Sequence, residues 1–276
     1  MKNRFWLVAL LALVAAPAAA RPLDDVLSSG TLVIAVYRNF APWSFEESGT
    51  LTGIDVEIGR LLAEHLHVAP KFLARMPGED VDSDLRANVW RGDIVDRVMA
   101  DVMLHVPVDK ELGLRNDMVV ICCAYEQERM AVVVDPEAVP AVSFGAFRNR
   151  KIAVEGGSTA DLLLSALYNG AISDNVRRAT SFEAAVAQFS SGEVPALMAT
   201  RAQVEWAAAK AGRRVSVEEW PLLGVVKTSW PVGLATRVDA HDLAYALEDA
   251  LTEAAKDGRL AAIHARFNVT WQPPAN

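Results

Sequence analysis

The segment Thr31–Tyr37 reads TLVIAVY, and it is followed by Phe40–Trp43, FAPW, and by a helical pattern that opens at Gly53-Ile-Asp55. Apolar and β-branched residues fill the first segment, which predicts a buried strand. The helical pattern continues to Leu66, with apolar residues three and four apart, and predicts an amphipathic helix that faces the core. A buried strand, a loop and an amphipathic helix in this order predict the first unit of an α/β fold.

Strand and helix patterns alternate along the rest of the chain. This alternation predicts parallel sheets with crossover helices, and hence an α/β protein. The predicted strands are Leu32–Tyr37, Asp101–Leu104, Met130–Val134, Ile152–Val154 and Pro195–Ala199. The predicted helices are Asp55–His65, one from Ser158, one capped by the 180–183 segment and ending near Gly192, one from Leu243 to Gly258 and a shorter one to Phe267.

The first 20 residues have the pattern of an export signal. Lys2 and Arg4 precede the apolar stretch Trp6–Ala15, and Ala18–Ala20 provides small residues for cleavage. We expect the mature chain to begin near Arg21 and to reach the periplasm. An uncleaved amphipathic anchor is the alternative.

Length and charge narrow the function classes. The chain of 276 residues is long enough for two lobes even after the signal is removed. Its formal net charge is −8, and loss of Lys2 and Arg4 makes the mature chain more acidic still. Nucleic-acid binding usually requires a basic surface, so we expect no nucleic-acid partner.

The two cysteines, Cys122 and Cys123, are neighbours within an apolar run. Consecutive Cα atoms lie about 3.8 Å apart, which is below the usual range for a disulfide. The spacing therefore favours two small buried thiols. A vicinal disulfide is the alternative, because an exported protein meets an oxidising compartment.

The order of several short motifs resembles that of the family 3 periplasmic solute-binding proteins, which are mostly the polar amino-acid receptors of bacterial ABC importers. The motifs are Phe40-Ala-Pro-Trp-Ser44, Gly53-Ile-Asp55, Ala100-Asp-Val-Met-Leu104, Gly156-Gly-Ser-Thr159, Ser191-Gly-Glu-Val194 and the ending Ala250–Leu260. The resemblance covers nearly the whole mature chain. It implies a two-lobe fold of the type II periplasmic binding class, with residues 22–126 and 231–276 in lobe one and 127–230 in lobe two. It also implies a monomer that closes around a small-molecule ligand, needs no cofactor or metal, and delivers the ligand to an ABC permease at the inner membrane.

Ligand contacts follow from the same resemblance. Asn39 and Phe40 lie on the first loop, where the family places an aromatic wall, and Trp43 follows on that loop. Ser158 and Thr159 lie at a predicted helix start, whose hydroxyl and N–H groups suit a ligand carboxylate. A core position for Trp43 and a simple N-cap role for Ser158 are the alternatives.

Two positions depart from the family pattern. Where amino-acid receptors have small hydroxyl residues and then an arginine that clamps the α-carboxylate, this chain has His105, and Arg115 lies about two residues too far along. Where the family commonly has an aspartate for the ligand's ammonium group, counting gives Thr200. We therefore expect His105 and Thr200 at the cleft, and a ligand that is not a typical α-amino acid. A cleft imidazole would favour an acidic or aromatic ligand.

The acidic segment with Asp80, Asp82 and Asp84 resembles a solvated loop with a helix cap at Asp84 more than a calcium loop, because the required glycine and distal glutamate are missing. Trp90 either lines the cleft or packs under this loop. No nucleophile elbow, zinc-protease motif or phosphate loop is present, which argues against an enzyme. Two alternatives to a transport receptor stay open, an accessory protein of a periplasmic quinoprotein dehydrogenase and a cyclohexadienyl dehydratase-like enzyme.

Overall fold

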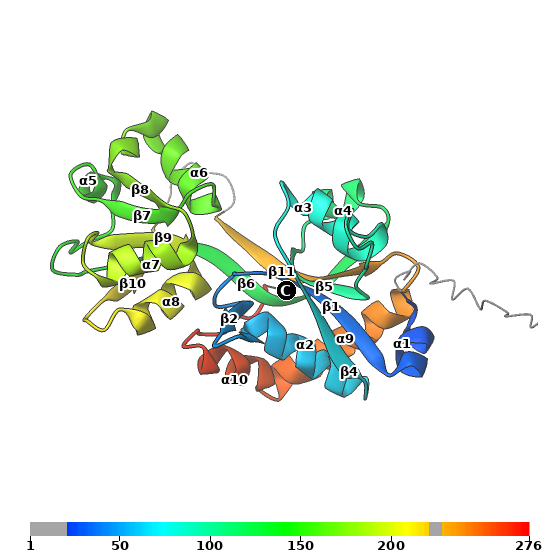
Figure 1. The fold of residues 1–276 in the computed structure, drawn as a ribbon. Coiled ribbons are helices and arrows are strands. Elements are labelled where there is room, and N and C mark those ends of the chain that lie inside the picture. Colours follow the sequence, from blue (N-terminus) through cyan, green and yellow to red (C-terminus); the bar gives the residue numbers. More distant parts are fainter. Residues whose placement is uncertain (1–20, 221–227, 276) are drawn as a thin grey trace, which may run out of the picture.

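The structure is a computed structural model that describes residues 21–220 and 228–275. The predicted export signal lies outside the described residues. Within them, no helix combines the length and the apolar character needed to cross a bilayer. Figure 1 shows two bodies of helices and strands joined by a pair of long strands, which confirms the predicted α/β class.

The first body, which we call lobe one, contains the N-terminal elements and the last two helices. Its elements are α1 (Leu23–Ser29), β1 (Thr31–Tyr37), β2 (Phe45–Glu47), β3 (Thr50–Thr52), α2 (Ile54–His65), β4 (Ala69–Arg75), α3 (Val81–Leu85), a π-helical turn (Arg86–Trp90), β5 (Val102–Pro107), α4 (Lys110–Arg115), α9 (His241–Lys256) and α10 (Arg259–Arg266).

The second body, lobe two, contains the middle of the chain. Its elements are α5 (Phe144–Phe147), β7 (Ile152–Glu155), α6 (Thr159–Ala166), two 3₁₀ turns (Leu167–Gly170 and Ser173–Asn175), β8 (Val176–Ala179), α7 (Phe182–Ser190), β9 (Ala196–Thr200), α8 (Arg201–Lys210) and β10 (Ser216–Glu218).

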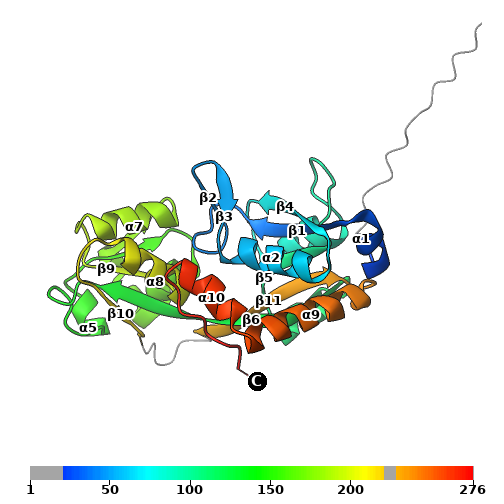
Figure 2. The same cartoon turned by 90° about the horizontal axis from the view of Figure 1, so that it is seen from below.

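The lobe-one sheet is built around β1, which pairs in parallel with β4 on one side and with β5 on the other. Leu32, Ile34 and Val36 of β1 are fully buried, as their apolar pattern predicts. The amphipathic helix α2 packs its buried residues Ile58 and Leu62 into the same core, and α9 and α10 lie beside it on the same side of the sheet (Figure 2).

In lobe two, β7 pairs in parallel with β8 and with β9. Val154 of β7, Leu164 of α6 and Met198 of β9 are buried in a core of this lobe together with Phe147. The predicted cap of α7 is displaced by one residue, because Ser181 is the N-cap and its hydroxyl accepts from the Ala184 N–H.

The long strands β6 (Val119–Val134) and β11 (Ser229–Arg237) connect the lobes. The first part of β6 pairs with β11 and the last five residues pair with β9. The strand predicted at Met130–Val134 is thus the end of a strand of 16 residues. The lobe boundaries expected near residues 126 and 231 stay a prediction.

Cys122 and Cys123 form a disulfide, so the favoured interpretation as two thiols is wrong. The bond is possible because β6 is irregular here. Between the pairs Val232↔Glu126 and Leu234↔Cys122, the single residue Gly233 lies opposite three residues of β6, and Cys123 has a φ of +60°. The short Cα–Cα distance, 3.7 Å here, therefore does not exclude the bond, and the vicinal disulfide named as the alternative is the one observed.

Candidate ligand-binding cleft

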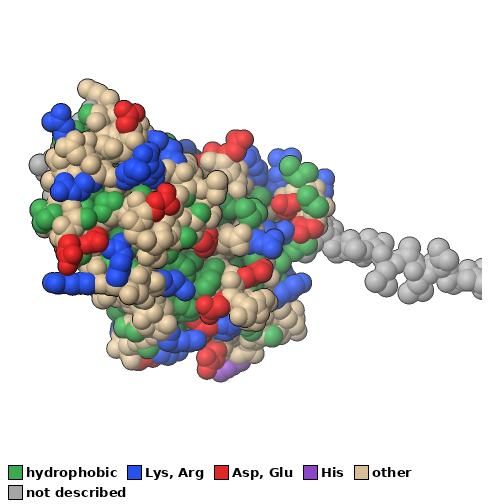
Figure 3. Space-filling view, turned by 60° about the vertical axis from the view of Figure 1, so that its left-hand side comes forward, with side chains coloured by type: hydrophobic (Ala, Val, Ile, Leu, Met, Phe, Trp, Pro, Cys, Tyr) green, Lys and Arg blue, Asp and Glu red, His purple; other side chains and the backbone are tan. Residues whose placement is uncertain are grey.

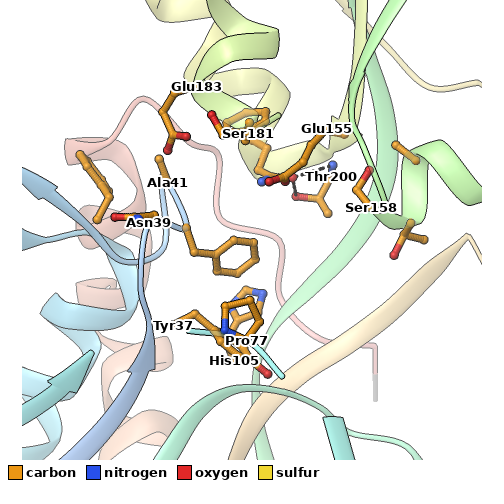
Figure 4. A pocket seen from close by; sticks show the side chains of 18 of the residues that line it. Tyr37, Asn39, Ala41, Pro77, His105, Glu155, Ser158, Ser181, Glu183 and Thr200 are labelled. Atoms are coloured by element: carbon orange, nitrogen blue, oxygen red, sulfur yellow. Dashed lines mark hydrogen bonds between the residues drawn. The ribbon is translucent and has the colours of Figure 1, made fainter. Parts of the chain in front are cut away.

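A cavity of about 1050 Å³ lies between the lobes. Figure 4 shows Tyr37, Asn39, Ala41, Pro77 and His105 on the lobe-one side, facing Glu155, Ser158, Ser181, Glu183 and Thr200 on the lobe-two side. In each lobe these residues lie at or just beyond the carboxyl ends of parallel strands, the edge at which open α/β sheets bind ligands.

The loop after β1 forms the aromatic wall of lobe one. Phe40 lines the cavity, and its ring is nearly perpendicular to that of His105, with the centroids 4.8 Å apart. The loop is fixed on the start of α2, because the Asp55 N–H donates to the Trp43 carbonyl at 2.8 Å. Gly53 makes this approach possible, since its φ is +128° and a Cβ there would lie 2.2 Å from the Trp43 oxygen.

A hydrogen-bond network beneath the wall orients His105. The carboxylate of Asp55 is fully buried, and it accepts from the Tyr125 hydroxyl at 2.7 Å and pairs with His105 Nδ1 at 3.1 Å. The Tyr125 hydroxyl in turn accepts from the His105 backbone N–H at 3.0 Å. Burial raises the pKa of Tyr125 well above its ordinary value, so the hydroxyl remains a donor to Asp55.

His105 is the extra residue of a β-bulge. Its neighbours Leu104 and Val106 pair with the adjacent residues Leu234 and Gly233 of β11, which leaves His105 unpaired with a φ of +62°. Bulges re-aim side chains and occur next to binding sites. With Nδ1 held by Asp55, Nε2 has no hydrogen-bond partner among the described residues, and the ring lines the cavity.

Lobe two contributes polar side chains from three strand ends. Glu155 ends β7, and the loop after it leads to Ser158, the N-cap of α6, whose hydroxyl accepts from the Asp161 N–H. Glu183 lies in the first turn of α7. Burial raises the pKa of Glu155, and the nearby charge of Glu183 raises it further, although the Phe182 N–H donates to it.

Thr200 ends β9 and lines the cavity next to a buried carboxylate. Burial raises the pKa of Glu128, a residue of β6, to about 7, although the Arg129 N–H donates to its carboxylate at 3.1 Å and opposes the rise. An acid that titrates near neutrality therefore lies beneath the wall of the cleft, in the strand that crosses between the lobes.

Six of the seven residues predicted to contact ligand line the cavity. They are Asn39, Phe40, His105, Ser158, Thr159 and Thr200. Trp43 is the exception, because its side chain is fully buried beneath His105, with ring centroids 4.5 Å apart. The core alternative describes its position, and Trp43 packs beneath the imidazole that lines the cavity.

The acidic loop differs from its prediction. Asp80, not Asp84, caps the helix α3, since its carboxylate accepts from the Ser83 N–H at 2.8 Å. Asp84 is buried and accepts from the Tyr37 hydroxyl at 2.8 Å. Among the described residues, no group of histidine, cysteine and acidic side chains is arranged to hold a metal ion.

Two other side chains considered from the sequence lie away from the cleft. Arg115 is more than half exposed and pairs with Asp82 at 3.1 Å, so it is engaged at the surface of lobe one. Trp90 packs against the buried cluster that contains Leu85 and Val89, which corresponds to packing under the loop.

Acidic and basic side chains are interspersed over the face shown in Figure 3, and hydrophobic side chains gather in its middle. The sequence analysis missed the two acidic residues of the lobe-two wall, Glu155 and Glu183. A signal was available for each, because Glu155 directly follows a predicted strand and precedes a Gly-Gly turn, and Glu183 lies in a predicted helix start.

No protein-family model and no curated protein matches the chain. Solved structures do match. An ancestral cationic amino acid solute-binding protein has a TM-score of 0.70 at 22% identity, covering 89% of this chain and 98% of its own. An amino acid ABC transporter substrate-binding protein from Streptococcus pneumoniae, bound to L-arginine, has a TM-score of 0.65 at 17% identity, with coverages of 89% and 97%. An ancestral amino-acid-binding protein, described as a precursor of cyclohexadienyl dehydratase, has a TM-score of 0.63 at 20% identity, with coverages of 89% and 98%.

The fold is that of a two-lobe periplasmic binding protein. At this level of identity the matches establish the architecture, and they agree with the resemblance seen in the sequence motifs.

Proposed function

We propose that the protein is an exported receptor that binds a small organic solute between its lobes and presents it to an ABC importer. The observation that carries this proposal is the cavity of about 1050 Å³, lined from both lobes by loops at the carboxyl ends of parallel strands. Its size suits a small molecule, since ligand pockets usually measure about 300–1,000 Å³. A ligand that touches both walls stabilises the closed arrangement of the lobes over the open one.

The same proposal includes the importer partner, the monomeric state, the removal of residues 1–20 and the periplasmic location. They rest on the sequence motifs and on the ABC substrate-binding proteins among the structural neighbours. Genes for a permease and an ATPase beside this gene would support transport. Genes for a quinoprotein dehydrogenase and a cytochrome would instead support the accessory role.

A thermal-shift screen over amino acids, amines, organic acids and sugars tests the receptor role, because a ligand that binds only the folded protein raises its melting temperature. Small-angle scattering then compares the free and liganded protein, and we expect the radius of gyration to fall when the lobes close. Absence of any stabilising compound, or stabilisation without compaction, would count against a hinged receptor.

Phe40→Ala tests the cleft directly. Phe40 is half-buried at the cavity wall and packs on His105, so its truncation removes ligand contact area while the core beneath it remains. We expect the ligand-induced rise in melting temperature to decrease, with a cooperative unfolding transition retained. An unchanged ligand response would remove Phe40 from the binding surface.

A dehydratase is the second candidate. Asp55 holds His105 Nδ1 and leaves Nε2 unpartnered at the cavity, an arrangement that suits acid–base chemistry. One structural neighbour is described as a precursor of cyclohexadienyl dehydratase. Incubation with prephenate or arogenate, followed by detection of an aromatic product, decides between catalysis and binding alone.

A further inference from the structure

Among the residues that the structure describes, the lining of the cleft includes more acidic than basic side chains. The acidic lining residues are Glu46, Glu47, Glu155 and Glu183, and the basic ones are Arg38 and Lys210. Both basic residues are engaged. Arg38 lies 3.6 Å from the carboxylate of Glu46, and the ammonium group of Lys210 lies 4.4 Å from the centre of the Trp206 ring. Arg38 thus already has an acidic neighbour on the same wall, and the ammonium group of Lys210 is held against an aromatic ring.

Glu155 and Glu183 face the cavity together from lobe two (Figure 4). No salt bridge joins either of them to a basic residue within the described part of the chain. Glu155 is half-buried, and the charge of Glu183 disfavours its negative form, which raises the pKa of Glu155. A cation placed between them and the opposite wall relieves this repulsion, whereas an anion increases it.

The start of α6, the natural seat for a ligand carboxylate, already holds one. Asp161 accepts from the Gly157 N–H at 3.0 Å and from Arg178 Nε at 2.7 Å, and the Ser165 hydroxyl donates to it at 3.0 Å. This buried carboxylate uses an N–H of the turn and the nearest guanidinium. A second carboxylate, on a ligand, would meet like charge at this place.

The wall of lobe one also suits a donor group. With Nδ1 engaged by Asp55, the accessible Nε2 of His105 is oriented to accept a hydrogen bond when the ring is neutral. The ring of Phe40 packs against this imidazole and lines the cavity, and aromatic faces attract cations. This contact and the acidic wall are independent observations from opposite lobes, and both favour a ligand with positively charged N–H groups.

We propose that the cleft selects an organic cation without a carboxylate, a protonated amine or guanidinium compound, with its charged group at Glu155 and Glu183. This inference rests on the proposed receptor function and specifies its ligand class. It replaces the expectation, drawn from His105 alone, of an acidic or aromatic ligand.

The decisive comparison uses agmatine and arginine, which differ only in the α-carboxylate. Melting temperature and calorimetric titration are measured for both, together with putrescine as a second amine and glutarate as a carboxylate. We expect agmatine and putrescine to bind, arginine to bind at least about tenfold more weakly than agmatine, and glutarate not to bind.

Glu155→Gln and Glu183→Gln keep the side-chain shape and remove the charge, and each should weaken agmatine binding about tenfold. Glu193→Gln is the matched control, because Glu193 is exposed on the same lobe and does not line the cavity. Agmatine affinity that is unchanged in both cleft variants would overturn the inference, as would tighter binding of glutarate or arginine than of agmatine. If acids bind and amines do not, the cationic ligand class is refuted while the receptor function stands. If no amine, acid or sugar binds, the receptor function itself is refuted.

Discussion

The pH dependence of the unfolding free energy tests the burial of the Glu128 carboxyl group in the strands that cross between the lobes. Glu128 lies on β6, is only 1% exposed, and one of its carboxylate oxygens, Oε2, has no hydrogen-bond partner in residues 21–220 and 228–275. Burial raises its pKa from 4.5 to about 7, and the charge of Glu126 on the same strand adds to the rise. The folded protein therefore binds a proton at Glu128 more tightly than the unfolded chain does.

The sign of the pH dependence follows from this difference. Stability from Glu128 is fully present below about pH 4.5 and is lost progressively as the pH rises through about 7. A shift of about 2.5 pKa units corresponds to about 3 kcal/mol over the whole range, and to about 2–3 kcal/mol between about pH 5 and about pH 8. Glu128→Gln is neutral at every pH and should lose this dependence.

Urea unfolding of the ligand-free protein, followed by circular dichroism, measures the effect. The unfolding free energy of Glu128→Gln minus that of the parent should move by about 2–3 kcal/mol in favour of the variant between about pH 5 and about pH 8. The same quantity for the exposed control Glu193→Gln should stay nearly constant. If the difference in unfolding free energy between Glu128→Gln and the parent does not change with pH, a raised pKa of the buried Glu128 carboxyl is refuted. A cost of the substitution that is the same at every pH does not affect this test.

Two further changes test the irregular strands. Gly233→Ala places a Cβ 2.2 Å from the Cys122 carbonyl oxygen and should destabilise the protein by about 2 kcal/mol or more in urea unfolding. Gly113→Ala is the control, because no atom lies within 4 Å of its Cβ, and it should be neutral or stabilising by about 0.5 kcal/mol. Equal effects would contradict the close approach of the two strands. Thiol titration of the unfolded protein should find no free thiol before reduction and both Cys122 and Cys123 after it, and a free thiol in the untreated protein would contradict the disulfide.

The elements that the sequence predicted well are those whose burial is decided by their own pattern. Thr31–Tyr37 is apolar along its length and forms a strand with covered faces, and Ile54–His65 repeats its apolar residues at helical spacing. Ser158 caps its helix through a local hydrogen bond, and Ser181 does the same one residue beyond the predicted cap position. In each case the interactions that fix the element lie within a few residues of it.

The strand β6 shows where local patterns stop being informative. Glu126 and Glu128 interrupt its apolar sequence. Two glutamates in this pattern indicate exposed positions, yet both are buried. Glu126 lies 3.2 Å from His264 of α10 and accepts from the Gln272 N–H, so its burial depends on the last helix and the C-terminal segment. A window of β6 alone does not contain these partners.

The residues of the candidate site were also only partly predictable from the sequence. Phe40 and Thr200 were expected at the cleft from the resemblance to a known family, and His105 was expected there because it follows a strand at the carboxyl edge of the sheet. All three line the cavity. Glu155 satisfies the same principle, since it is the last residue of β7. It was missed because attention went to positions shared with the resembled family, and charge at a strand end is the signal that finds it.

The orientation of His105 has no such signal, because it depends on three strands together. Gly233 of β11 lies opposite a bulge in β5 on one side, which frees His105 from pairing, and opposite the irregular part of β6 on the other, which joins Cys122 to Cys123. A residue with a side chain would hold the strands apart, as its Cβ would overlap the Cys122 carbonyl. The candidate ligand-contacting imidazole and the disulfide are therefore two consequences of one close approach. Each looks unrelated to the other along the chain, because the glycine that links them lies more than 100 residues away from both.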